Sequence, residues 1–259
     1  MNICIRNSQK SELFTSIFQH IRLFTENINI TFSKERMYLQ SMDSSRVSIF
    51  ELVLPSEWFD EYNFTQNGSF TIGVNSIILF KILNTRDKTQ NTLINYDNND
   101  QLFIHFTCEN KSIYDKHFEL PLIEIDEELM DIPTSESNAE ITINSTNFSN
   151  IISQLKIFGD TIEIECSEEK IELHSISPES GKMMVNIDIN ELTAYSINEG
   201  EVIHLSFSLA ILQNICLYHK LSKEMNIYLT DQFPLKLVYI LGDENSTMTF
   251  YLAPKITED

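Results

Sequence analysis

The sequence has little of the residues that make flexible linkers and none of the long apolar runs that cross membranes. Only 6 glycines and 6 prolines occur in 259 residues, so long flexible linkers are not expected. The apolar runs fall far short of the roughly 20 residues that a membrane helix needs. The opening residues, Met1–Arg6, lack the charged lead and long apolar stretch of a secretory signal. We therefore expect an intracellular protein with no membrane partner.

Cysteine is also scarce, and the four cysteines are far apart. They are Cys4, Cys108, Cys166 and Cys216. No two of them form the C-x-x-C pair that zinc sites use, and their spacing does not suggest a disulfide framework. The sequence therefore predicts buried free thiols and no metal site.

Signatures of catalysis are missing as well. The sequence contains no nucleophile elbow, P-loop or dinucleotide fingerprint. The six histidines are dispersed, and core or surface positions account for them better than catalysis does. We predict no catalytic residue, no cofactor and no enzyme.

Basic residues are also few. The chain has 18 Lys and Arg but 38 Asp and Glu, which gives a net charge of −20. A nucleic-acid-binding protein usually carries a basic patch or a high pI. Nucleic-acid binding is therefore compatible with this chain only if most of the acidic residues lie on another surface.

The chain repeats itself once, at a shift of 134 residues. Five apolar residues at helical spacing recur with the same spacing: Phe14, Ile17, Phe18, Ile21 and Phe24 fall on Phe148, Ile151, Ile152, Leu155 and Phe158. Alternating apolar positions typical of half-buried strands follow in both halves. The shift falls to 133 and then 132 toward the end, so the repeat covers nearly the whole chain.

The repeat predicts two similar α+β domains, each with two helices and a set of strands. Helices are expected near residues 11–24 and 76–84, and again near 145–158 and 209–221. Residues 122–137 are rich in carboxylates and contain Pro133, which is typical of an exposed connector. We predict an N-terminal domain over 1–121, a connector over 122–137 and a C-terminal domain over 138–259.

Each helix has one apolar stripe to bury, so both helices of a domain are expected to cover the same side of its sheets. Their outer faces carry a few basic residues, because Arg22 falls on Lys156 in the repeat while Lys81 and Lys220 belong to the second helices. Acidic residues are scarce there, with Glu12 the exception. An ordinary solvated surface is the alternative interpretation of these four cations.

Two segments resemble a known family. Leu39–Ser48 (LQSMDSSRVS) and residues 250–256 (FYLAPKI) are similar to segments of eukaryotic proliferating cell nuclear antigen (PCNA). Weaker matches lie between them in the family's order, so the resemblance covers the full chain.

The resemblance implies a DNA sliding clamp, a polymerase processivity factor that encircles double-stranded DNA as a homotrimer. Helices would line the hole of the ring and antiparallel sheets would form its outside. Arg22, Lys81, Lys156 and Lys220 would then face DNA, without reading its sequence. Ser153 and Leu217 stand where the family commonly has a basic residue. Subunits would join through strand edges near 109–118 and 177–187.

The resemblance also implies a pocket for the PIP-box peptides of partners, which carry Gln-x-x-aliphatic-x-x-aromatic-aromatic. The expected wall consists of Met42, Ile49, Met130, Ile132, Pro234, Tyr251, Leu252, Ala253 and Pro254. Ordinary core and tail packing is the alternative interpretation of these residues. An extended peptide could pair with the flanking backbone.

The implied partners are DNA polymerase, other PIP-box proteins, the clamp loader and further copies of the chain. The implied location is the nucleus, or a cytoplasmic replication site for a viral chain. A subunit of a heterotrimeric checkpoint-type clamp is the competing hypothesis, against which the intact "LAPK" segment argues. Glu168 stands where the family usually has a modifiable lysine.

Overall fold

The computed structural model describes residues 1–109, 113–132 and 135–255, and it divides the chain into two units. The first unit contains Met1–Ser44, Glu51–Met130 and Leu241–Thr247, and the second contains Ser45–Phe50, Asp131–Ile240 and Met248–Asp259. The predicted connector, 122–137, is therefore shared between the units. The domain boundaries at residues 121 and 137 remain predictions.

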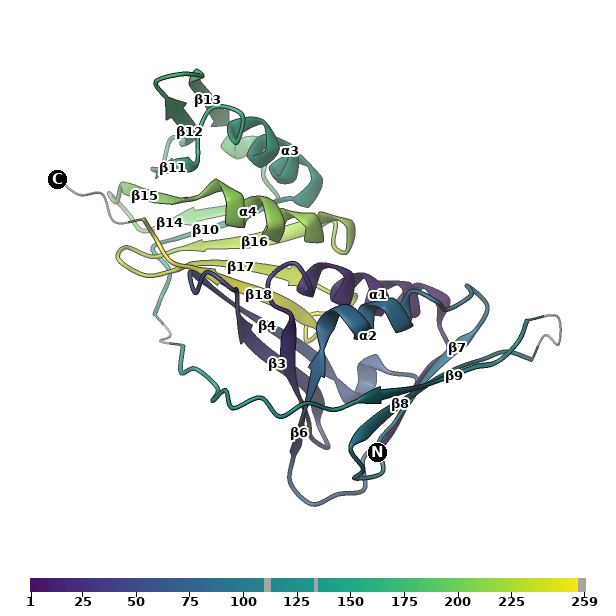
Figure 1. Ribbon diagram of the computed structural model, residues 1–259. Coiled ribbons are helices and arrows are strands. Elements are labelled where there is room, and N and C mark those ends of the chain that lie inside the picture. The colour runs from purple at the N-terminus through teal and green to yellow at the C-terminus, as the bar shows by residue number, and fades with distance from the viewer. Residues whose placement is uncertain (110–112, 133–134, 256–259) are drawn as a thin grey trace. The chain divides into compact units, whose positions relative to one another are not determined.

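The first half of the chain supplies two helices and the strands that they cover. In chain order these are β1 (Asn2–Ile5), α1 (Ser8–Ile21), β2 (Asn27–Phe32), β3 (Arg36–Met42), β4 (Ser48–Pro55), the short 3₁₀ helix η1 (Ser56–Trp58), β5 (Glu61–Asn63), β6 (Phe70–Asn75), α2 (Ser76–Leu83), β7 (Asn91–Asn95), β8 (Gln101–Thr107) and β9 (Lys116–Pro121). Helices α1 and α2 lie side by side (Figure 1).

The second half supplies a similar set. It consists of β10 (Ala139–Asn144), α3 (Ser145–Leu155), β11 (Thr161–Cys166), β12 (Ile171–Ser177), β13 (Gly181–Ile187), η2 (Ile189–Glu191), β14 (Ala194–Ile197), β15 (Ile203–Ser208), α4 (Leu209–Cys216), η3 (Leu217–Lys220), β16 (Glu224–Leu229), β17 (Leu235–Ile240) and β18 (Thr247–Leu252). Helices α3 and α4 also lie side by side (Figure 1).

The sheets confirm the sequence repeat, because their strand orders correspond one to one. In the first half β5-β1-β7-β8-β9 pair in that order, and in the second half β14-β10-β16-β17-β18 do the same. The remaining strands pair as β4-β3-β2-β6 and as β13-β12-β11-β15. The strands of both halves pair in antiparallel registers, for example with Ile30 opposite Leu39 and Ile164 opposite Leu173. Counterparts such as β9 and β18 can therefore be compared directly.

The apolar stripes that defined the repeat form the cores. Ile17, Phe18 and Ile21 of α1 and Ile152 and Leu155 of α3 are completely buried. Burying one such side chain contributes roughly 1.5–3 kcal/mol. Along the strands, buried residues alternate with half-buried ones, as in β8, which is the pattern of a sheet that is covered on one face. The predicted α+β class is confirmed.

Asparagine caps decide where three of the helices begin. Asn7 accepts hydrogen bonds from the backbone of Gln9 and Lys10 at the start of α1, Asn75 accepts one from Ile78 at the start of α2, and Asn144 accepts one from Asn147 at the start of α3. An Asn cap satisfies backbone N–H groups that have no partner within the helix. Because Asn7 does this, α1 begins at Ser8, earlier than the expected residue 11.

The second helix of the C-terminal half is shorter than predicted. α4 ends at Cys216 and the chain tightens into the 3₁₀ turn η3, so a continuous α-helix to residue 221 is wrong. Among the described helices the longest, α1, has 14 residues, and none of them carries an apolar stretch that could span a bilayer.

Candidate nucleic-acid interface and partner pocket

The exposed faces of the four helices are mostly polar, with Ile78 of α2 an apolar exception, and they are almost free of carboxylates. In α1–α4 as described, Glu12 is the only acidic residue, and α3 and α4 contain no charged residue at all. The exposed positions are mainly amides and hydroxyls, such as Gln19, Asn150 and Gln213. The bulk of the negative charge therefore lies on loops, strands and the connector.

Arg22 is held at the C-terminal end of α1. Its guanidinium carbon lies 4.5 Å from the centroid of the Phe80 ring on α2, and its Nε donates to the carbonyl of Gln19 at 3.1 Å. No carboxylate of the described residues pairs with it within 4.0 Å. A stacked guanidinium keeps its charge, so this end of α1 presents an uncompensated cation.

Lys156 occupies the corresponding position at the end of α3 but is compensated. Its ammonium forms an ion pair with Asp160, which is four residues further on. The hydrogen bond from Lys156 is the main cause that lowers the pKa of Asp160. Asp160 therefore stays ionised at neutral pH, and Lys156 offers less positive potential than Arg22.

The other two predicted cations are exposed and lie on second helices. Lys81 is in the last turn of α2, and Lys220 ends the 3₁₀ turn η3. Lys223, another exposed residue just beyond Lys220, was missed by the sequence analysis. Lys10 on α1 is turned toward Trp58 instead, whose carbonyl it contacts at 2.6 Å.

A cavity of about 460 Å³ lies in the second unit, next to residues of β10, β16, β17 and β18. Its lining consists of Ile132, Ser135, Glu136, Ser137, Glu140, Tyr228, Thr230, Phe233, Pro234, Lys236 and Tyr251. A cavity of this size with apolar and aromatic walls and a few polar groups fits one or two side chains of a ligand.

Three of the nine predicted pocket residues line this cavity, namely Ile132, Pro234 and Tyr251. Ile49 and Pro254 are half-buried and Ala253 is exposed in the same unit. Leu252 is fully buried, so its side chain belongs to the core. Met42 and Met130 are half-buried residues of the first unit.

The sequence analysis missed the polar part of the lining. Tyr228 and Lys236 are directly opposite each other on β16 and β17, and Glu140 on β10 is opposite Tyr228. The alternation of apolar and polar residues along β16 and β17 could have predicted them, because residues two apart on a strand face the same side. Lys236 is two residues from Pro234, which was predicted.

The connector is attached to the rest of the first unit at several points before it reaches Ile132. Ile123 donates its N–H to the carbonyl of Gly73 at 2.9 Å, and the amide of Asn29 donates to Ile125 at 3.2 Å. Gln40 then makes two bonds with the backbone of Met130, donating to its carbonyl at 3.0 Å and accepting from its N–H at 2.7 Å.

Only glycine fits where the connector first crosses β6. A Cβ on Gly73 would collide with the carbonyl oxygen of Ile123, because the two backbones form an isolated antiparallel bridge there. The connector is therefore a fixed segment at both this bridge and Gln40.

Comparisons with known proteins agree with these features. Residues 6–129 match the model of the proliferating cell nuclear antigen N-terminal domain, and residues 131–255 match that of the C-terminal domain. The chain belongs to the PCNA family. It is 28% identical over 257 residues to a proliferating cell nuclear antigen of Chaetomium thermophilum, covering 97% of each chain. It is 28% identical over 254 residues to that of Dictyostelium discoideum, covering 95% of this chain and 97% of the relative.

Membership in the PCNA family makes this chain a sliding clamp and DNA polymerase processivity factor. The checkpoint-type alternative is not favoured, since both family models and both relatives are of the PCNA kind. Clamps of this family are non-enzymatic scaffolds.

The strand edges expected to join PCNA subunits are β9 and β13. In the described part of the chain each pairs on one side only, β9 with β8 and β13 with β12. Apolar side chains are exposed beside both, with Tyr114 85% and Met184 48% accessible. Residues 110–112, part of the predicted 109–118 edge, lie outside the described residues.

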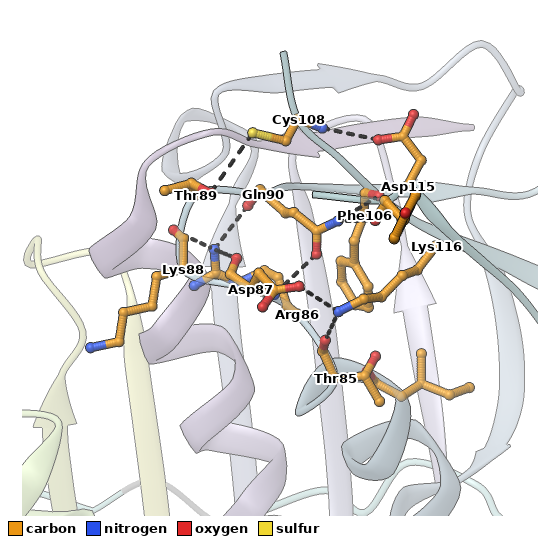
Figure 2. A network of polar contacts seen from close by, with 12 residues as sticks. Thr85, Arg86, Asp87, Lys88, Thr89, Gln90, Phe106, Cys108, Asp115 and Lys116 are labelled. Atoms are coloured by element: carbon orange, nitrogen blue, oxygen red, sulfur yellow. Dashed lines mark hydrogen bonds and ion pairs between the residues drawn. The ribbon is translucent and has the colours of Figure 1, made fainter. Parts of the chain in front are cut away.

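A polar network holds β9 in place (Figure 2). The buried amide of Gln90 donates to the carbonyls of Phe106 and Tyr114 at 3.3 and 2.9 Å and accepts from the N–H of Asp87 at 3.0 Å. The ammonium of Lys116 lies 2.6 Å from the carboxylate of Asp87. The loop after α2 therefore fixes the start of β9.

Proposed function

We propose that this clamp works as a closed homotrimeric ring that slides on duplex DNA. The outer faces of α1–α4 are turned toward the DNA, and the cavity beside Tyr251 receives PIP-box peptides. The clamp acts as a scaffold for DNA polymerase and other PIP-box proteins, without a catalytic step, after a clamp loader has placed it. Its working location is the nucleus, or a cytoplasmic replication site for a viral chain.

The correspondence between the strands of the two halves supports the homotrimer. Strand β9 is the counterpart of β18, and β13 is the counterpart of β4. Within the second unit, the segment entering β4 lies against the end of β18, because Ala253 donates to the carbonyl of Val47 at 3.0 Å and the Phe50 and Phe250 rings are 6.3 Å apart. The same pairing between β9 of one copy and β13 of the next would cover two unpaired edges.

The sparse charge of the helix faces suits sliding. A closed ring cannot leave the DNA whatever its affinity, so strong phosphate contacts would only slow its movement. Few cations on an otherwise neutral polar surface give weak, sequence-independent attraction. The carboxylates of the connector and loops repel DNA from the other surfaces.

The homotrimer is tested by light scattering after size-exclusion chromatography of the lone chain. With a chain mass of 30.1 kDa, a trimer has three times that mass. We expect this mass at micromolar concentration in moderate salt. A monomer under these conditions would contradict the ring.

The pocket is tested with Ile132→Ala and a PIP-box peptide in calorimetry. Removing this apolar wall should weaken binding about tenfold or more, because burial of an aliphatic group is worth roughly 1.5–3 kcal/mol. Ile123→Ala is the matched control, since Ile123 is an exposed connector residue that does not line the cavity. Equal affinities in the two folded variants would place the site elsewhere.

A further inference from the structure

Lys236 introduces the one basic side chain into a described cavity lining that otherwise consists of apolar, aromatic, hydroxyl and acidic residues. Its ammonium lies 5.0 Å from the centroid of the Tyr228 ring, directly across from it on the neighbouring strand. Tyr228 is in turn opposite Glu140, so the three side chains form a row across β17, β16 and β10.

The ammonium of Lys236 has no carboxylate partner within the described chain. None of the described ion pairs, which extend to 4.0 Å, includes it. Glu140 belongs to the same row, but it is engaged by the hydroxyl of Ser137 at 2.6 Å. The Tyr228 ring supplies only a cation–π contact, which is worth less than a charge-assisted hydrogen bond.

A peptide that fills this cavity must cover Lys236. The residues around it, Pro234 just before the start of β17 and Tyr251 on β18, are apolar walls of the same space. Covering a cation without an acceptor is costly, because the ammonium loses its water. An acceptor carried by the peptide removes that penalty, and a carboxylate does so best.

We propose that Lys236 is a specificity-determining residue that selects partner peptides with an Asp or Glu beside their apolar anchors. The inference rests on the proposed function, since it concerns the same cavity. It specifies that the polar side of the pocket, at Lys236, binds an acidic side chain of the peptide. Peptides whose only features are apolar and aromatic anchors leave Lys236 covered and unpaired, and they bind more weakly.

Fluorescence anisotropy with labelled synthetic peptides tests the assignment. The reference peptide carries the aliphatic and aromatic anchors with Gln at every other position, and each further peptide has Glu at one of these positions. With the unmodified clamp, Glu at one or two positions should tighten binding about tenfold. Lys236→Gln should abolish this preference, and Lys236→Glu should reverse it.

Lys34→Gln is the matched control, because it removes the same charge from an exposed turn of the first unit. It should leave the preference unchanged. The assignment is overturned if no position prefers Glu, or if the preference survives in Lys236→Gln. If the reference peptide itself does not bind, the proposed pocket fails and the inference with it, whereas binding without a Lys236-dependent preference overturns the inference alone.

Discussion

The two halves of the chain repeat the same strands and helices, yet the cations at the ends of α1 and α3 have different surroundings. Arg22 lies over Phe80 and has no carboxylate partner among the described residues, whereas Lys156 is paired with Asp160. The repeat therefore conserves the position of the basic residue without conserving the potential that it presents. One carboxylate, four residues after Lys156, is enough to make the electrostatic potential at the two helix ends different.

A second pair of counterparts differs in the same way. Gln40 and His174 are 134 residues apart and lie on β3 and β12. Gln40 binds the backbone of Met130 in the connector, while Nε2 of His174 lies 2.9 Å from Glu163 on the adjacent strand. One copy of the position fixes a segment that leads to the partner cavity, and the other belongs to a charged sheet surface.

Reversing both helix-end cations should have the largest effect. Arg22→Glu with Lys156→Glu shifts the helix faces by four charge units per chain, two residues changing by two units each. Stimulation of a partner polymerase on primed DNA should collapse, and residual DNA affinity should lose its salt dependence, because counterion release scales with the phosphates neutralised. Each single reversal should show a greater loss for Arg22, which is uncompensated.

The control for this experiment is Lys34→Glu with Arg36→Glu. These residues lie at the exposed turn between β2 and β3, and the charge change is the same. Trimer mass and peptide affinity should be retained in both double variants. Similar loss of polymerase stimulation in the two would show that the helix faces are not the DNA-facing surface.

Removing the hydrogen bonds between Gln40 and the connector should have an intermediate effect. Gln40→Ala deletes two hydrogen bonds to Met130, each worth about 0.5–1.5 kcal/mol, so the segment before Ile132 loosens. We expect faster hydrogen exchange at the Met130 amide and peptide binding weakened about threefold to tenfold. His174→Ala should change neither quantity. A Gln40→Ala clamp with unchanged exchange and affinity would show that the connector is held by its other contacts.

The smallest expected effect is a gain. Asp160→Asn removes the partner of Lys156, so the end of α3 should become as positive as the end of α1. DNA affinity at low salt should rise about twofold to threefold, with a steeper salt dependence. The lowered pKa of Asp160 keeps it ionised at neutral pH, so the gain should be measurable there. The same substitution in an Arg22→Ala background tests whether Lys156 can take over, and no gain in either background would remove Lys156 from the DNA surface.

The sequence predicted the repeat, the α+β class and the approximate helices, because apolar periodicity is a local record of which face is buried. The stripe of Phe14, Ile17 and Phe18 indicates a helix wherever the chain places it. Helix ends were less accurate, since they depend on caps such as Asn7 and on the 3₁₀ turn after Cys216. The resemblance to PCNA supplied the pocket residues, of which Ile132, Pro234 and Tyr251 line the cavity.

Tertiary structure decided most of the polar contacts at the proposed sites. Lys156 and Asp160 are only four residues apart. The other contacts join residues that are distant in sequence: Arg22 stacks on Phe80, Gln40 forms hydrogen bonds with Met130, and Glu140, Tyr228 and Lys236 form a row across three strands. Their partners are set by strand register and helix packing. The charge count of the sequence determined that the clamp is acidic, and the fold determined where its few cations remain uncompensated.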